Sequence, residues 1–159
     1  MPTLPWVGPG GTKSEVLVMA SRLEVRRLRE VPGFFLASVA LWRQARRSSG
    51  VHGLGLKAEL LKRTFWTVSA WSDKKALYAY ARAEPHHSTM RRLRSVTHES
   101  TFVFWTAEPG ELPITWTEVK RRIADQRAAE ALNEAEPISD GSPRSTDSLM
   151  LPPFDGRGC

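Results

Sequence analysis

The fold is decided by the stretch Thr64-Phe65-Trp66-Thr67-Val68-Ser69-Ala70-Trp71, which is followed at once by Ser72-Asp73. Residues 64–71 are rich in β-branched and aromatic side chains, so they predict a strand. Ser72-Asp73 is typical of a helix N-cap, and a helical pattern continues from there to Arg94. Thr101-Phe102-Val103-Phe104-Trp105 predicts a second aromatic strand. The segment 64–105 is therefore expected to form a strand, a helical region and a strand.

Apolar patterns and turn residues outside this segment predict four further elements. They are a buried strand at 16–23, a helix at 32–49, a strand at 51–63 and a last helix from Thr115 or Thr117 to about Leu132. The turn before Thr64 is short, so the strands on its two sides are expected to form an antiparallel hairpin.

The resulting order β-α-β-β-α-β predicts an α+β fold, the ferredoxin-like plait, with an added C-terminal helix. Right-handed crossovers place both helical regions of the plait on one side of a four-stranded sheet. The other face would be bare unless a second copy covered it, because an exposed apolar sheet is a common sign of an interface. A homodimer, in the form of a dimeric α/β barrel, is therefore expected.

The chain of 159 residues is long enough for one domain and a tail. Prolines and glycines in residues 1–13 predict a flexible lead-in. The ferredoxin-like domain is expected to cover 14–132. Residues 133–159, rich in Ser, Asp, Gly and Pro, predict a disordered acidic tail.

Localisation is predicted from what the sequence lacks. No apolar run approaches the ~18 residues of a membrane-spanning helix. The N-terminus shows no basic region followed by an apolar core, as a secretory signal would. The single cysteine is Cys159, the last residue, so no internal disulfide framework is possible. These features predict a cytoplasmic, reduced protein.

Charge is unevenly spread along the chain. Residues 1–123 carry a net charge of +10 and residues 124–159 carry −4, which together give +6. A basic body fits a nucleic-acid or anionic partner, or simply many solvated arginines. RNA-recognition modules of this fold need stacking aromatics on the central strands, and the matching stretch 63–70 lacks the glycine and two of the aromatics. The sequence therefore does not favour nucleic-acid binding.

Metal binding is not predicted either. His86 and His87 are adjacent, so on a helix their side chains point about 100° apart and cannot share one ion. Pro85 interrupts the helical pattern, and after it His86, Met90 and Leu93 share one face. His86 with Met90 one turn further on, near aromatic side chains, suits either a haem site or a hydrogen-bonded histidine at the edge of an ordinary core.

The strings from Thr64 to Leu77 and Glu84-Pro-His86-His-Ser-Thr-Met90-Arg resemble the antibiotic biosynthesis monooxygenase-like superfamily of dimeric α/β barrels. In that superfamily a strand ends in a tryptophan, a short helix follows, and a histidine-bearing stretch precedes the last strand. Phe102-Val-Phe-Trp105 and Leu112-Pro-Ile-Thr-Trp116-Thr-Glu118 are more particularly similar to a branch of uncharacterised proteins related to spheroidene monooxygenase. The resemblance covers about residues 14–123.

The resemblance implies several activities. The superfamily includes cofactor-independent oxygenases acting on polycyclic aromatic compounds, haem-degrading enzymes, haem-binding oxygenases and proteins with no known reaction. Haem degraders pair a tryptophan, an asparagine and a histidine. The only asparagine here is Asn133, outside the first strand, which speaks against haem degradation. His86 matches the pocket histidine.

The expected function is a monooxygenase-like oxidoreductase that acts on a small aromatic or polyene metabolite. His86 would be the base, or would bind haem together with Met90, so the cofactor is either none or haem. The substrate-binding residues would be Trp66, Trp71, Phe102 and Trp105 as apolar walls, with Arg63 holding a substrate oxyanion. The alternative is a non-catalytic dimer that binds haem or a small molecule. A cavity beside His86 would favour the enzyme.

Overall fold

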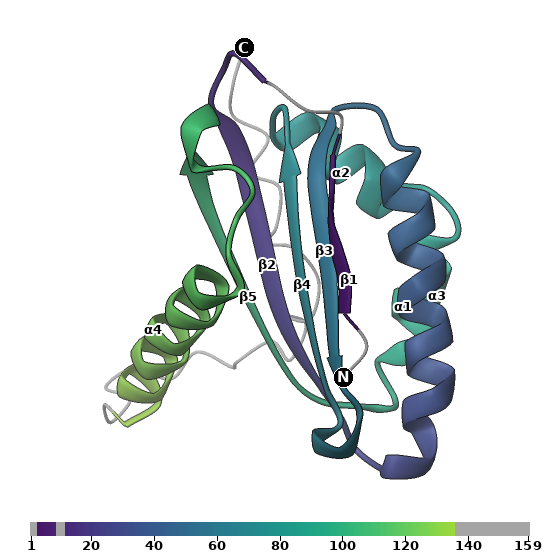
Figure 1. Ribbon diagram of the computed structural model, residues 1–159. Coiled ribbons are helices and arrows are strands. Elements are labelled where there is room, and N and C mark those ends of the chain that lie inside the picture. Colours follow the sequence, from purple (N-terminus) through teal and green to yellow (C-terminus); the bar gives the residue numbers. More distant parts are fainter. Residues whose placement is uncertain (1–2, 9–11, 136–159) are drawn as a thin grey trace, which may run out of the picture.

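The computed structural model describes residues 3–8 and 12–135. It contains one five-stranded antiparallel sheet in the order β1-β3-β4-β2-β5 (Figure 1). The strands are β1 (Thr3–Val7), β2 (Val16–Val25), β3 (Val51–Glu59), β4 (Thr64–Trp71) and β5 (Thr97–Ala107). The helices are α1 (Val31–Arg46), α2 (Lys74–Arg82), α3 (His86–Leu93) and α4 (Trp116–Ala135). The predicted α+β, ferredoxin-like fold is confirmed.

The helical region after β4 divides into two helices. Asp73 caps α2 as predicted, because its carboxylate accepts a hydrogen bond of 2.8 Å from the backbone N–H of Ala76. Helix α2 ends at Arg82, and α3 begins directly after Pro85. Proline lacks the N–H that a continuing helix needs. The proline therefore sets the start of α3 and the place of His86.

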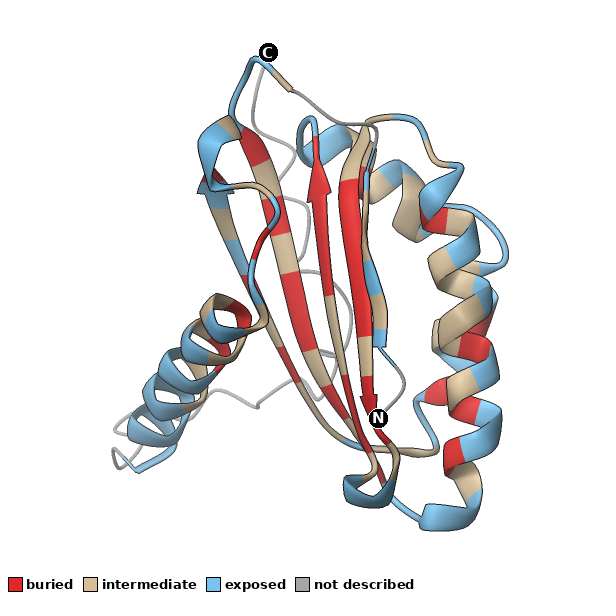
Figure 2. Ribbon diagram, viewed as in Figure 1, coloured by how far each residue is buried: buried red, intermediate tan, exposed pale blue. Residues whose placement is uncertain are grey.

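Two layers of helices lie on opposite faces of the sheet. Figure 1 shows α1, α2 and α3 on one face, called here the cavity face, and α4 on the other, called the α4 face. On the cavity face Phe34 of α1 packs on Phe65 of β4, with ring centroids 4.6 Å apart. Figure 2 shows that the central strands are mostly buried.

The prediction of a bare second face was wrong. Helix α4 crosses β2 and β5, and Val119 and Ile123 pack into one apolar cluster with strand residues such as Val18 and Val103. These α4 residues are at most 1% exposed. The C-terminal helix was predicted correctly from the sequence, but a helix pattern does not tell which face of a sheet the helix will cover.

Strand β1 was also not expected. It lies within the predicted lead-in and pairs antiparallel with β3, where Thr3 faces Lys57 and Leu4 faces Leu56. Helix α4 extends to Ala135, beyond the predicted start of the tail at 133. The rest of the predicted tail, 136–159, lies outside the described residues.

Gly53 of β3 leaves room for the ring of Trp6 from β1. The Trp6 ring of β1 lies over Gly53 so closely that a Cβ on this glycine would lie 2.0 Å from the ring. Gly55 is covered in the same way by Trp116, at 3.3 Å. The absence of side chains at these two positions lets two indole rings lie flat against the α4 face.

We expect Gly53→Ala to lower the free energy of unfolding by about 1–3 kcal/mol, because the added methyl group displaces the Trp6 ring. Urea unfolding followed by tryptophan fluorescence measures the change. Gly33→Ala is the matched control, since nothing lies within 4 Å of its new Cβ. In a Trp6→Ala background the effect of Gly53→Ala should largely disappear, and an unchanged effect there would contradict the packing role.

Candidate functional site

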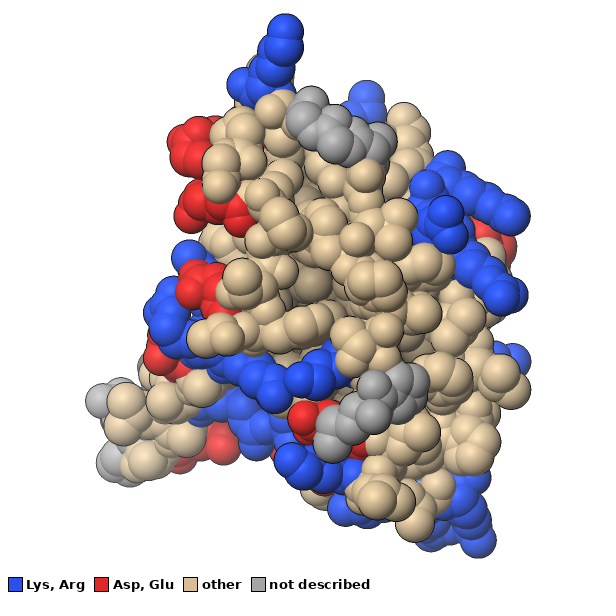
Figure 3. Space-filling model, in the orientation of Figure 1, with Lys and Arg blue, Asp and Glu red and all other residues tan. Residues whose placement is uncertain are grey.

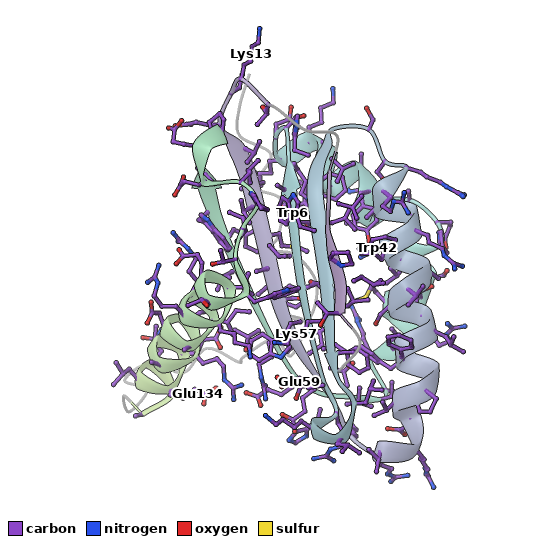
Figure 4. The ribbon with its side chains drawn as sticks, viewed as in Figure 1. Trp6, Lys13, Trp42, Lys57, Glu59 and Glu134 are labelled. Atoms are coloured by element: carbon purple, nitrogen blue, oxygen red, sulfur yellow. The ribbon has the colours of Figure 1, made fainter. Side chains whose placement is uncertain are left out.

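A cavity of about 100 Å³ lies between the cavity face of the sheet and helices α1 and α3. Its walls are mostly apolar, and they include Met19 and Leu56 from the sheet, Trp42 from α1, and His86 and Met90 from α3. Figure 4 shows Trp42 between the sheet and α1, whereas Trp6, Lys57 and Glu59 lie on the α4 side. The cavity predicted beside His86 is therefore present.

The imidazole of His86 is held in one orientation. Its Nδ1 lies 3.0 Å from the backbone carbonyl oxygen of Ala81, so Nδ1 carries the proton and donates it. Its ring packs at 4.6 Å on Tyr80, whose ring stacks on Trp71 at 5.0 Å. The Tyr80 hydroxyl donates to the carbonyl of Leu41 in α1. Contacts from α1, α2 and β4 thus fix the histidine.

Burial and the neighbouring groups determine the protonation state of His86. Burial lowers the pKa of His86, and neighbouring His87 lowers it further, against the opposing effect of the Ala81 carbonyl. The ring is therefore neutral near pH 7. Because Nδ1 holds the proton, Nε2 carries the free lone pair, and it has no hydrogen-bond partner among the described residues. A neutral, oriented imidazole of this kind can serve as a general base.

Three hydroxyl groups add a polar strip to the sheet side of the cavity. Ser21 and Thr67 are hydrogen-bonded across β2 and β4 at 2.6 Å, and Ser69 accepts a hydrogen bond of 2.8 Å from the Trp71 indole. Ser21, Thr67 and Ser69 all belong to the cavity wall. They offer a phenol or carbonyl oxygen of a bound molecule a place to bind opposite His86.

Trp42 contributes a further polar atom. Its indole Nε1 is buried and has no hydrogen-bond partner among the described residues. An unsatisfied buried N–H is unfavourable, so a bound acceptor that reached it would gain affinity. The sequence pattern did not predict Trp42, Tyr80 or the Ser21–Thr67 pair as parts of the site. Their spacing carries no signal, because their meeting depends on how strands and helices pack.

The predicted site residues divide into those near the cavity and those remote from it. Met90 and Phe102 line it together with His86. Trp71 is fully buried and lies behind Tyr80, so it supports the histidine through the stack and does not form part of the wall.

The prediction that Trp66 and Trp105 line the cavity was wrong. Successive strand residues point to opposite faces, and both tryptophans pack in the cluster on the α4 face. There Trp66 lies beneath Arg22 and Lys120, at 5.7 and 5.3 Å, and Trp105 contacts Arg122 at 4.4 Å.

The substrate-binding role of Arg63 is also contradicted. Arg63 lies in the turn between β3 and β4 with φ of 55°. Its guanidinium donates to the carbonyl of Arg26 at 2.6 Å and pairs with Glu24 at 3.6 Å. Neither contact lies at the cavity, so Arg63 joins two turns of the backbone.

The described residues contain no group of three or more His, Cys, Asp or Glu side chains placed to hold a metal ion. Within the same residues, no helix is both long and apolar enough to span a membrane. The cavity does not fit haem. An engineered cavity of about 150 Å³ just holds benzene, so about 100 Å³ is far too small for a porphyrin. His86 and Met90 line the cavity but leave no space for haem between them.

Several solved structures share this fold. PA3566 from Pseudomonas aeruginosa aligns with a TM-score of 0.55 at 15% identity over 61% of this chain and 98% of that one. An antibiotic biosynthesis monooxygenase aligns with a TM-score of 0.52 at 14% identity, over 57% of this chain and 97% of that one. A variant of SnoaB, a cofactor-independent oxygenase from Streptomyces nogalater, aligns with a TM-score of 0.50 at 17% identity, over 58% of this chain and 92% of that one.

These similarities establish the fold, and the resemblance to the superfamily beyond the fold stays a prediction. No protein-family model matches the sequence, and no curated protein matches it. The narrower relation to the spheroidene monooxygenase branch stays a prediction. Each of the three alignments covers nearly all of the other protein but leaves a large part of this chain unmatched.

The lowered pKa of His86 predicts a pH-dependent stability. Below about pH 6.5 the unfolded chain takes up a proton at this histidine that the folded chain accepts only at lower pH. The free energy of unfolding should therefore fall as the pH drops below about 6.5. Urea unfolding between pH 7.5 and 5 measures this, and His86→Gln should remove this part of the decline. His87→Gln leaves His86 in place and should keep it; equal slopes in wild type and His86→Gln would contradict the assignment.

Proposed function

We propose that this protein is a monooxygenase-like oxidoreductase that acts on a small aromatic metabolite with His86 as general base. The observation that supports it best is the apolar cavity beside an oriented, neutral imidazole. The solved structures with the same fold include a cofactor-independent oxygenase, which makes such chemistry compatible with the fold.

The chemistry needs an electron-rich phenol. Its hydroxyl would lie near Nε2 of His86, which removes the proton and leaves a phenolate that reacts with O₂. One oxygen atom enters the ring and becomes a quinone oxygen, and the other leaves as water with the two hydrogens lost from the substrate. The phenolate supplies the electrons, so no external reductant is required. The apolar walls exclude water from the reactive intermediate.

The volume of the cavity limits the substrate. A space of about 100 Å³ is smaller than the ~150 Å³ that holds benzene, so even a single-ring compound requires flexible wall side chains such as Met19 and Met90 to move, and a polycyclic ring system or a long polyene is too large. The small volume also supports a second candidate function, which is binding of a small apolar molecule without turnover. The two functions differ in the role of His86, because simple binding does not require a base.

We expect His86→Gln to lower kcat by about 10²–10⁴-fold and to leave the affinity for the phenol nearly unchanged. Oxygen uptake with a panel of single-ring phenols and hydroquinones measures turnover, and calorimetric titration without O₂ measures binding. Glutamine retains an N–H that can donate to the Ala81 carbonyl. His87→Gln is the control and should retain wild-type rates.

Cavity filling separates binding from catalysis in the same assays. The Ser38 side chain lines the cavity, and among the described residues its one hydrogen bond is to the Phe34 carbonyl of its own helix, at 2.8 Å. Ser38→Leu should therefore abolish both binding and turnover. Ser48 makes the equivalent bond to Gln44 but does not line the cavity, so Ser48→Leu should change neither. Binding without turnover in the wild-type protein would leave only the binding function, and full turnover in His86→Gln would show that His86 is not the base.

We further propose that the protein forms a homodimer through the part of the α4 face that α4 itself leaves open. This part lies over β3 and β4, where the half-buried rings of Trp6, Trp66 and Trp116 add apolar surface. Figure 3 shows an uncharged area there, bordered by Lys and Arg side chains. Light scattering should give twice the chain mass of 17.8 kDa. A stable monomer at micromolar concentration would contradict this assembly.

A further inference from the structure

One end of the molecule gathers exposed cationic side chains and exposed leucines. At this end β2 leads into α1, β3 turns into β4, and α3 leads into β5 (Figure 1). Segments 26–30, 61–63 and 91–94 lie here, and together they carry eight Lys or Arg residues and one acidic residue. We call these three segments the basic end. Figure 3 shows Lys and Arg side chains around this lower end.

Backbone and side-chain hydrogen bonds join the three segments into one surface. The Val25 N–H donates to the Arg63 carbonyl at 2.8 Å, and the Arg63 guanidinium donates to the Arg26 carbonyl. Arg26 in turn donates its backbone N–H to Val96 and its Nε to Thr97, at 2.8 and 3.1 Å. The backbones that carry the charged side chains are therefore held at fixed positions relative to one another.

Two leucines project from this surface into solvent. Leu61 is 90% exposed in the turn between β3 and β4, directly before Lys62 and Arg63. Leu28 is 55% exposed and lies between Arg27 and Arg29. Single exposed leucines are common, but an apolar side chain enclosed by cations on a rigid turn is suited to the boundary between lipid headgroups and acyl chains.

A second, smaller hollow adjoins the cavity on the side of the basic end. This hollow of about 20 Å³ shares five wall residues with the cavity, among them Phe34, Met90 and Phe102. Its further walls are Arg94, Thr97 and Ser100, the first two of which lie near the Val96–Arg26 contact in the chain. Shared side chains alone thus separate the cavity beside His86 from a hollow that reaches the basic end.

We propose that the basic end binds the surface of an anionic phospholipid membrane, and that apolar molecules pass from the membrane into the cavity at this end. Lipid phosphates bind to the exposed arginines Arg27, Arg29, Arg91 and Arg92, and Leu28 and Leu61 enter the acyl boundary. Single-stranded nucleic acid fits less well, because the three segments contain no aromatic residue for base stacking. The passage of the ligand rests on the proposed function, whereas the membrane contact does not.

Flotation of the full-length chain with vesicles tests the membrane contact. Vesicles of phosphatidylcholine alone are compared with vesicles containing about one-third phosphatidylglycerol, at about 0.1 M salt. The chain should float with the anionic vesicles only. The affinity for anionic vesicles should fall as the salt concentration is raised, because salt screens the attraction between the basic residues and the lipid headgroups.

Two sets of variants separate charge from apolar insertion. Arg27→Gln/Arg29→Gln/Arg92→Gln should weaken binding about 100-fold, from about 1 kcal/mol for each cation near an anionic surface. Its control is Arg43→Gln/Arg47→Gln/Lys75→Gln, which removes three exposed cations outside the basic end. Leu28→Ser/Leu61→Ser should weaken binding about tenfold. Its control is Leu36→Ser/Leu132→Ser, at leucines that are 69% and 70% exposed.

Each contrary outcome overturns the proposal. Equal flotation with neutral vesicles removes the role of charge, and equal losses in the control variants remove the role of this end. If a single-stranded oligonucleotide binds more tightly than the vesicles and the leucine variants leave its binding unchanged, the surface is a nucleic-acid site. Vesicle binding is measured without ligand and turnover without vesicles, so failure of one assay is distinguishable from failure of the other.

Discussion

The alternation of side chains along β2 and β4 is the constraint on which the rest of the structure depends. Because these central strands are paired over their whole length, each residue is committed to one of two faces. Ser21 and Thr67 face α1 and α3 and form part of the cavity. Arg22 and Trp66, one position away along each strand, face α4. A shift of one residue along β4 would replace Thr67 with Trp66 in the cavity wall. The same shift along β2 would replace Ser21 with Arg22.

The position of His86 depends indirectly on which face of the sheet the β4 side chains occupy. His86 begins α3 because Pro85 ends the preceding turn, and its ring is then fixed by Tyr80, which itself lies on Trp71 of β4. The sheet therefore supports the imidazole through the Trp71–Tyr80 stack, on which the His86 ring packs at a tilt of 58°. The hydrogen bond of Nδ1 to Ala81 fixes the tautomer and leaves the lone pair of Nε2 available.

Much of the architecture could be predicted from local patterns, and much of the site could not. The limits of β4, the cap at Asp73 and the break at Pro85 follow from residue preferences over a few positions, and the structure has them as expected. Trp66 and Trp105 were assigned to the cavity because they are large, aromatic and near the right elements in the sequence. Which face of a strand they occupy depends on the registers of several strands, and that information is spread over residues far apart in the chain.

The short strand β1 has a consequence for how the sheet can grow. A strand at the edge of a sheet presents unpaired N–H and C=O groups on which a further strand can add. Pro5, in the middle of β1, has no N–H to offer, so the ladder is interrupted on that side. Polymerisation by edge-to-edge strand addition is thereby hindered beside β1.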